Sequence, residues 1–122
     1  MSLEFKSSGP IYLQLMQEFK KEIVSEIRKP GDKIESVRDL SRSLGVSPGT
    51  IQRAFLEMER EGLLYTKRTN GRYVTQDTAR IDQLRRQFMM EMVADFVEQM
   101  RESGVKDTEI LDNVQQYLEG VS

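Results

Sequence analysis

Apolar residues recur at every fourth position in the first part of the chain, after the pair Gly9–Pro10. The positions are Ile11, Leu15, Phe19, Ile23 and Ile27. This spacing puts them on one side of a helix and predicts an amphipathic helix of about four to five turns. Pro30 cannot continue a helix and Gly31 permits a turn, so we expect the helix to end at Lys29–Asp32. Ile34 is then expected as a short extended residue against the core.

Two shorter helical patterns follow, and a tight turn separates them. Ser36 is a suitable N-cap for the first pattern, Asp39 stands at the capping-box distance, and Gly45 is a suitable left-handed stop. In the second pattern Ser47 is the expected N-cap, and Pro48 takes the first helical position, where its missing N–H costs nothing. Apolar residues give each helix one buried side, namely Leu40 and Leu44 in the first and Ile51, Ala54, Phe55 and Met58 in the second.

Strand-forming residues and a turn signal follow the second of these helices, which is expected to end at Gly62. Leu64–Thr66 and Tyr73–Thr75 are the predicted strands. Asn70–Gly71 lies between them and predicts a type I′ hairpin turn, in which both central residues have positive φ. Three cations lie near the tip of this hairpin: Lys67, Arg68 and Arg72. A helix–turn–helix followed by a hairpin is the layout of a winged helix, in which the hairpin is the wing.

The last third of the chain carries a longer apolar pattern. From about Ala79 to Glu102 an apolar stripe recurs at helical spacing, which predicts a helix of roughly 36 Å. Ser103–Gly104 ends it, and a further helix is expected to start at Asp107 or Thr108. The stripe is too long for the short helix to cover, so we favour a subunit interface over a ligand pocket or a membrane-facing surface. The expected interface residues are Ile81, Leu84, Phe88, Met92, Phe96, Met100, Leu111, Val114 and Leu118.

Together these elements predict a mostly α-helical fold class with one small β-hairpin. We expect a flexible N-terminus over residues 1–9 and a winged helix-turn-helix domain over residues 10–76. A two-helix C-terminal dimerisation segment is expected over residues 77–122. In a symmetric homodimer the two recognition helices match two half-sites about one helical turn of DNA apart, which gives dimerisation a mechanistic purpose.

The composition argues against several kinds of active site. The chain of 122 residues has no cysteine and no histidine. This excludes disulfides and thiolate chemistry and removes the commonest metal ligand and general base, so we expect no enzyme, metal or cofactor. No apolar run approaches the roughly 18–20 residues that span a bilayer, and the first residues lack a signal-peptide pattern. We therefore expect a cytoplasmic protein without a membrane partner.

Charge is distributed unevenly, although the formal net charge is only −2. Residues 1–76 hold 13 Lys and Arg against 10 Asp and Glu, whereas residues 77–122 hold 5 against 10. DNA binding needs a local basic face rather than a basic protein. The first part of the chain therefore suits double-stranded DNA as a partner, although two ordinary solvated surfaces would give the same counts.

The start of the second helix in the pair carries residue types that read DNA. Glutamine can pair with adenine and arginine with guanine, whereas serine and threonine bind phosphate or base. Cations on the preceding helix and on the hairpin are placed for phosphates. Capping and solvation explain each residue singly, and the combination favours DNA contact. The four tyrosines are expected to pack with a solvated hydroxyl. The expected DNA-contacting residues are Arg38, Arg42, Ser47, Gly49, Thr50, Gln52, Arg53, Lys67, Arg68, Gly71 and Arg72.

Residues 10–75 resemble the winged-helix domain of the GntR family of bacterial repressors. The resemblance lies in the opening Pro10–Gln14, in Ile34–Phe55, in Leu56–Leu64 and in Gly71–Val74 of the wing. The short two-helix C-terminal part is similar to the YtrA-like subfamily, whose members lack a large effector domain. The resemblance implies DNA-binding repression as a homodimer, often of an operon that includes transporter genes. By position it implies DNA contacts at Arg38, Ser47, Gly49, Thr50, Gln52, Arg53 and Gly71.

Three residues depart from the family pattern at the expected DNA surface. Glu35 stands in place of a proline, which puts an acid near the DNA and leaves the start of the next helix less rigid. Pro48 stands in place of an arginine contact of other subfamilies, and Arg72 in place of a threonine of the wing. Sequence preference therefore does not carry over from the family. The alternatives are a winged helix that binds protein instead of DNA, and a small-molecule effector pocket between the C-terminal helices.

Overall fold

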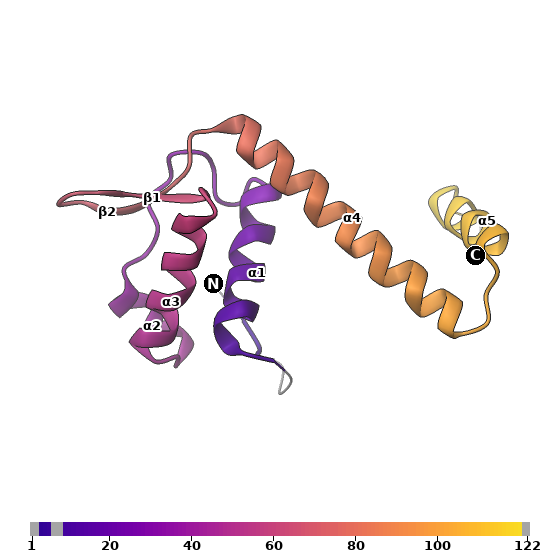
Figure 1. The fold of residues 1–122 in the computed structure, drawn as a ribbon, viewed down its shortest axis with the longest axis horizontal. Helices are drawn as coiled ribbons and strands as arrows, with labels where there is room; N and C mark the ends of the chain where they lie inside the picture. Colours follow the sequence, from indigo (N-terminus) through magenta and orange to yellow (C-terminus); the bar gives the residue numbers. More distant parts are fainter. Residues whose placement is uncertain (1–2, 6–8, 121–122) are drawn as a thin grey trace. The chain divides into compact units, whose positions relative to one another are not determined.

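The computed structural model describes residues 3–5 and 9–120, which form five helices and one two-stranded antiparallel sheet (Figure 1). The expected fold class, mostly helical with one hairpin, is confirmed. The chain divides into two compact units, Met1–Arg85 and Arg86–Ser122. In chain order the elements are α1 (Ile11–Val24), α2 (Val37–Leu44), α3 (Pro48–Arg60), β1 (Leu64–Lys67), β2 (Gly71–Val74), α4 (Thr78–Glu102) and α5 (Asp107–Leu118).

The core of the first unit forms where α1 and α2 pack against α3. α1 and α3 lie side by side (Figure 1), and Phe19 of α1 meets Phe55 of α3 edge to face, with ring centroids 5.6 Å apart. Leu15, Ile51 and Met58 are completely buried in the same core. Burial of one such side chain stabilises a fold by about 1.5–3 kcal/mol, so the apolar spacing of α1 and α3 largely determines how they pack.

The first helix ends earlier than its apolar spacing predicts. α1 stops at Val24, Glu26 has a left-handed φ of 66°, and Ile27 is 71% exposed instead of lying on the buried face. The backbone N–H of Arg28 donates to the carbonyl of Glu22 over 3.0 Å, and its side-chain Nε donates to the Glu22 carboxylate over 2.9 Å. These contacts turn the chain back on the helix, so they override the four-residue repeat at its last position.

The two helices of the helix–turn–helix have the capping contacts that their sequence predicts. The Ser36 Oγ accepts a hydrogen bond from the Asp39 N–H at 3.0 Å, and Gly45 ends α2 with a φ of 66°. The Ser47 Oγ accepts from the Thr50 N–H at 3.4 Å, and α3 begins one residue after this cap. Such bonds satisfy N–H groups that have no partner within the helix. The predicted starts of both helices are confirmed.

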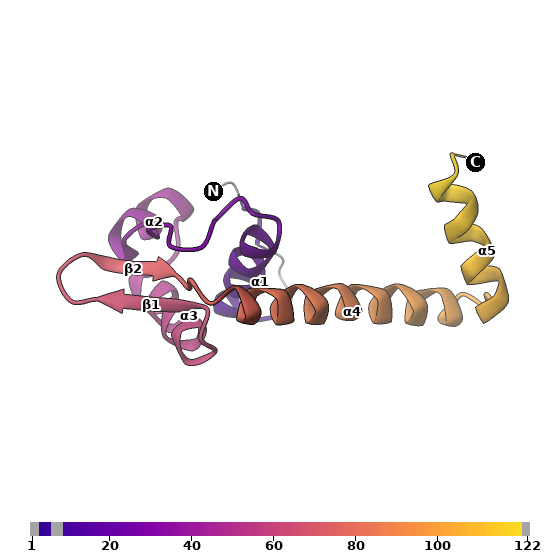
Figure 2. The same cartoon turned by 90° about the horizontal axis from the view of Figure 1, so that it is seen from above.

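The hairpin of β1 and β2 projects away from the three helices (Figures 1 and 2). The strands pair in antiparallel register from Leu64 opposite Val74 to Lys67 opposite Gly71. The predicted type I′ turn is wrong, because the Asn70 N–H donates to the Lys67 carbonyl at 3.1 Å and only Gly71 of the turn has a positive φ, 98°. Pairing of Lys67 with Gly71 leaves three residues between the strands. A connection of that length closes with one left-handed residue after a tight turn.

A short extended segment before α2 adds hydrogen bonds to the hairpin. The Ile34 N–H donates to the Arg72 carbonyl at 2.9 Å, and the Val74 N–H donates to the Asp32 carbonyl at 2.8 Å. The Ile34 side chain is only 3% exposed. The expectation of a short extended residue against the core is therefore confirmed. These bonds fix the base of the hairpin relative to the helix–turn–helix.

The first turns of α4 belong to the first unit. Ile81 and Leu84 are buried in the hydrophobic core that α1 and α3 form. The Arg80 Nε donates to the carbonyl of Glu61, just after α3, at 2.9 Å, and the Arg85 Nη2 donates to the last carbonyl of α1 at 2.8 Å. Charged donors near helix C-termini satisfy unpaired carbonyls and interact favourably with the helix dipole. Ile81 and Leu84, which the apolar stripe predicts at a subunit interface, are instead core residues of their own chain.

The second unit contains the remainder of α4 together with α5. Gly104, with a φ of 81°, lies in the connection between the two helices. Arg101 makes two hydrogen bonds to the Asp107 carboxylate, at 2.9 and 2.8 Å, and so joins the end of α4 to the start of α5. Ile110 is buried, whereas Met92 is 54% exposed. Two helices alone therefore leave much of the apolar stripe in contact with solvent.

Candidate DNA-binding surface

The first turn of α3 exposes small and polar residues to solvent. Ser47 and Gly49 are exposed, and Gln52 is partly exposed. The hydroxyls of Ser47 and Thr50 are 2.8 Å apart and share a hydrogen bond. Nothing lies within 4 Å of the place that a Cβ would take at Gly49, so a ligand has free access to the backbone there. Such a helix start presents N–H groups and short polar side chains to phosphates and base edges.

Arg53 lies one turn further along α3, where a tyrosine from α1 binds it. The Arg53 Nη2 donates to the Tyr12 hydroxyl at 3.2 Å, and its Cζ lies 3.9 Å from the centroid of the Tyr12 ring. The pair lines a cavity of about 450 Å³ between the starts of α1 and α3. The expectation that Tyr12 only packs misses this contact. The sequence signal that could have indicated a role for Tyr12 was its place in the opening motif Pro10–Gln14, which lies outside the helix–turn–helix.

Two exposed arginines lie on α2, the helix before the turn. Arg38 and Arg42 are four residues apart, so they share one face of the helix. Neither makes an ion pair or a side-chain hydrogen bond within residues 3–5 and 9–120. In contrast, Arg60 at the end of α3 pairs with Glu57 at 2.7 Å. Among the described residues nothing compensates the positive charges of Arg38 and Arg42, and this arrangement suits a phosphate contact.

Two of the three expected cations extend along the exposed end of the hairpin. The Lys67 Nζ lies 4.7 Å from the centroid of the Tyr73 ring, which stacks on Tyr65 at 5.7 Å. Arg68 is exposed in the turn and has no charged or hydrogen-bonding partner in the part of the chain that the structure describes. Gly71 follows the turn and is also exposed. The wing therefore presents two positive charges and an accessible backbone.

Arg72, the third expected cation of the wing, faces α3 instead. Its Nε hydrogen-bonds to the carboxylate of Glu59, and its Cζ lies 5.1 Å from the centroid of the Phe55 ring. Thr66 of the opposite strand donates to the same carboxylate at 3.1 Å. Only 19% of the Arg72 side chain is exposed. Because Glu59 attracts it, Arg72 joins the hairpin to α3 and does not add the expected charge beside a DNA groove.

Glu35, the acid expected near the DNA, is paired with a buried arginine. Arg28 donates from Nη1 and Nη2 to the two carboxylate oxygens of Glu35, at 3.0 and 2.9 Å, and its Nε binds Glu22. The hydrogen bonds from Arg28 hold the pKa of the Glu35 carboxyl below its usual value. Arg28 is only 8% exposed and lies over the ring of Phe19. The segment before α2 is thus fixed by this pairing, in contrast to the less rigid start expected from a missing proline.

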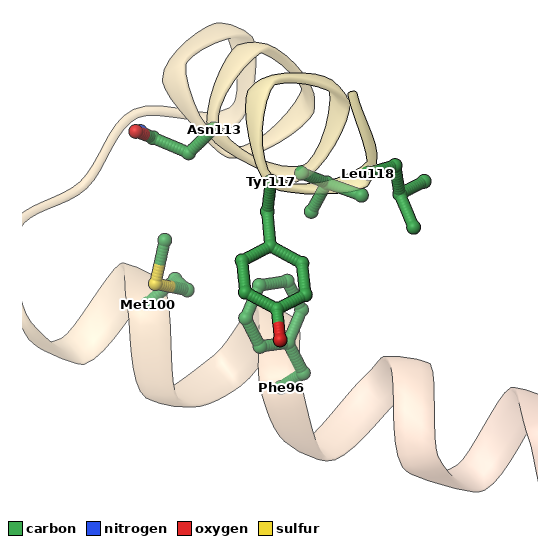
Figure 3. Close-up of a pocket in the computed structure, with 6 residues that line it drawn as sticks. Phe96, Met100, Asn113, Tyr117 and Leu118 are labelled. Carbon is green, nitrogen blue, oxygen red and sulfur yellow. The ribbon is translucent and has the colours of Figure 1, made fainter. Parts of the chain in front are cut away.

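The second unit presents an apolar surface and a cavity. Figure 3 shows Tyr117 extending from α5 toward Phe96 of α4 at this cavity, which has a volume of about 410 Å³. No helix in the described residues has the length and apolar character needed to cross a bilayer. The expected interface residues of this unit are all exposed or partly exposed: Phe88, Met92, Phe96, Met100, Leu111, Val114 and Leu118.

The chain is similar in sequence to bacterial transcriptional regulators. The family described as bacterial regulatory proteins, gntR family, matches residues 11–74. The uncharacterized HTH-type transcriptional regulator YhcF of Bacillus subtilis is 37% identical over 98% of this chain and 99% of its own length. The HTH-type transcriptional repressor YtrA of Bacillus subtilis is 39% identical over 63% of this chain and 59% of its own length.

Solved structures share the fold. A GntR family transcriptional regulator from Listeria monocytogenes matches with a TM-score of 0.84 and 38% identity, over 92% of this chain and 98% of that chain. The AraR DNA-binding domain, solved in complex with operator ORR3, matches with a TM-score of 0.54 and 29% identity. That match covers 62% of this chain and 90% of the AraR chain. The matched part of this chain therefore shares its fold with a domain that was solved on operator DNA.

Proposed function

The chain belongs to the GntR family of bacterial regulatory proteins, and we propose that it is a repressor that binds a palindromic operator as a homodimer. It is a DNA-binding transcriptional regulator and resembles the YtrA-like subfamily, as predicted. Its relative YtrA is named a repressor. The proposed place of action is the cytoplasm, where bacterial DNA lies. The relatives are named as regulators rather than enzymes.

The observation that carries the proposal is the set of uncompensated charges beside the open start of α3. Arg38 and Arg42 on α2 have no partner within residues 3–5 and 9–120, and neither has Arg68 on the wing. In winged-helix proteins, the helix before the turn and the wing both contact phosphates. These contacts fix the orientation of the protein on the duplex. A winged helix that binds only protein has no need for unpaired cations on both sides of the recognition helix.

Base reading is proposed for the exposed side of α3. Gln52 is partly exposed, makes no side-chain hydrogen bond within the described residues, and can pair with adenine through both polar atoms of its amide. Ser47 and Thr50 lie at the helix start with exposed or partly exposed hydroxyls. Arg53 presents the remaining donors of its guanidinium beside them. Lys67 and Gly71 of the wing complete the proposed contact surface.

Homodimerisation is proposed through the apolar surface of the second unit. Phe96 is 41% exposed and Leu118 is 78% exposed, although both are large apolar side chains. A contiguous apolar surface of this kind is unfavourable in water and usually marks an interface. A second copy supplies an identical surface, and its recognition helix supplies the second half-site contact. Ile81 and Leu84 are left out of this interface, because their own chain buries them.

A selection of bound sequences from random duplex DNA tests the proposal. The full chain should enrich a palindrome whose half-sites lie about one helical turn apart, because each half binds one recognition helix. An asymmetric site would contradict the homodimer, and the absence of any enriched site would contradict sequence-specific DNA binding. A protein-binding winged helix would give the last result, without salt-dependent retention on duplex DNA.

A second candidate function is the binding of an apolar effector in the second unit. The cavity of about 410 Å³ has almost entirely apolar walls, with Asn113 as a polar exception. Apolar pockets of this size admit small ligands. A ligand at this position would contact Phe96 and Tyr117, which belong to the proposed dimer surface, and would thereby change dimer stability. Measuring the dimer dissociation constant during titration with apolar ligands tests this candidate. If ligands bind but leave the dimer dissociation constant unchanged, the candidate is contradicted.

A further inference from the structure

Among the described residues, Arg53 of α3 has a neutral partner, in contrast to Arg60 of the same helix and Arg72 of β2. Arg60 and Arg72 each bind a glutamate, which compensates their charge. Arg53 instead binds Tyr12, with 3.9 Å between its Cζ and the ring centroid and 3.2 Å between its Nη2 and the hydroxyl. The contact spans 41 residues of sequence and joins the first turn of α1 to the second turn of α3.

We propose that Tyr12 is a positioning residue for DNA recognition, because it holds the Arg53 guanidinium in place without neutralising its charge. The proposal rests on the DNA-binding function of the chain. It brings α1 into the recognition surface, although α1 lies outside the helix–turn–helix.

The geometry leaves Arg53 free to bind DNA. A guanidinium has five N–H donors and two faces, and the contact with Tyr12 uses one face and one donor. The other donors and the full positive charge remain for a phosphate or a base edge. Arg53 is exposed, and the cavity of about 450 Å³ beside it has Ser47 and Thr50 in its wall. A DNA group in this cavity would therefore meet the guanidinium and the start of α3 together.

Holding Arg53 in place also reduces the cost of binding. A free arginine side chain loses rotamer freedom when DNA binds it, and this loss corresponds to about a two- to tenfold weaker affinity for one side chain. An acidic partner would hold the side chain as well, but it would compete with the phosphate. A tyrosine ring binds the cation through its π face, which leaves no opposing charge to displace.

A double-mutant cycle on the full chain tests the proposal. The dissociation constant for the selected operator is measured for wild type, Tyr12→Ala, Arg53→Ala and the double variant. Tyr12→Ala should weaken binding about two- to tenfold per subunit, which is about four- to a hundredfold for a homodimer with two copies. It should have no further effect once Arg53 is alanine. Arg60→Ala is the matched control, since it removes an exposed arginine of the same helix, and it should bind as wild type does.

Two further measurements separate positioning from folding. Tyr12→Phe keeps the ring under Arg53 and loses only the hydrogen bond, so it should recover most of the affinity that Tyr12→Ala loses. The slope of affinity against salt should stay unchanged in Tyr12→Ala, because the charge of Arg53 remains. If Tyr12→Ala destabilises the fold, the smaller loss in Tyr12→Phe must still disappear in the Arg53→Ala background.

Three outcomes overturn the positioning role. The first is wild-type DNA affinity in Tyr12→Ala. The second is that Tyr12→Ala lowers DNA affinity equally in the wild-type and Arg53→Ala backgrounds. The third is that Tyr12→Phe lowers DNA affinity as much as Tyr12→Ala does. Failure of the wild-type chain to select or retain any duplex would overturn the DNA-binding function as well. Specific binding by wild type with additive losses overturns only the role of Tyr12.

Discussion

Replacement of Arg38 by alanine tests the phosphate contact proposed for α2. Arg38 is exposed and makes no ion pair or side-chain hydrogen bond within residues 3–5 and 9–120. Its removal should therefore leave the free energy of unfolding within about 0.5 kcal/mol of the wild-type value. The variant lacks one positive charge per chain at the proposed DNA surface. A loss of affinity then reports the lost DNA contact and not a damaged fold.

The size of the effect follows from counterion release. Each phosphate contact contributes about 0.9 to the slope of the logarithm of the binding constant against the logarithm of salt concentration. A homodimer carries two copies of Arg38, so Arg38→Ala should reduce this slope by about 1.8, and by about 0.9 if a single chain binds. When salt is lowered fourfold, the deficit of the variant should grow about twelvefold for a dimer and about three- to fourfold for a monomer.

The assay is fluorescence anisotropy of a labelled duplex over a salt series, with the selected operator and a scrambled duplex. A phosphate contact carries no sequence information, so Arg38→Ala should lose the same factor on both duplexes. Arg60→Ala is the matched control, because its guanidinium pairs with Glu57 at 2.7 Å. An unchanged slope in Arg38→Ala, or an equal change in Arg60→Ala, would refute the argument. So would a loss confined to the operator, which would make Arg38 a base-reading residue.

Three other variants test the remaining parts of the structure. Glu35→Gln removes a carboxyl whose pKa Arg28 lowers, so its stabilisation is present above the unfolded pKa of about 4.3 and is lost as pH falls through the folded pKa. Urea unfolding should then depend less on acid pH in the variant, and an identical profile would contradict the pairing. Phe96→Glu, at a position 41% exposed, should convert dimer to monomer in sedimentation without changing helix content, and an unchanged mass would contradict the interface. Gln52→Ala should alter discrimination at one operator position by about 1–3 kcal/mol in competition among singly substituted duplexes. Equal weakening on every duplex would show that Gln52 does not read a base.

Elements with local determinants were predictable from the sequence. Ser36 and Ser47 cap helices through N–H groups three residues away, and Gly45 ends α2 because a left-handed residue costs glycine little. The recognition helix and its polar start follow from these residues and from the apolar spacing of α3. The end of α1 did not follow, since Arg28 lies beyond the end of the helix and reaches back to Glu22 of α1.

The hairpin shows where local signals reach their limit. Asn70–Gly71 correctly predicts a hairpin. The strand bounds are only partly correct, because β2 begins at Gly71 and ends at Val74, whereas the sequence predicts Tyr73–Thr75. The turn type depends on which residues pair across the strands, and pairing of Lys67 with Gly71 selects a longer connection. Register is set by contacts of the strands with α3 and with the segment at Ile34, which lie outside the turn itself.

The sequence by itself determined the order of the elements, the capped starts of α2 and α3, and an apolar stripe too long for one chain to cover. Only the tertiary structure decided which charges remain free for DNA. It pairs Arg72 with Glu59, Glu35 with Arg28, and Arg53 with a neutral tyrosine. The physical reason is that helix periodicity and capping act between residues a few positions apart. Ion pairing and burial depend on which elements face one another, and no spacing along the chain specifies that.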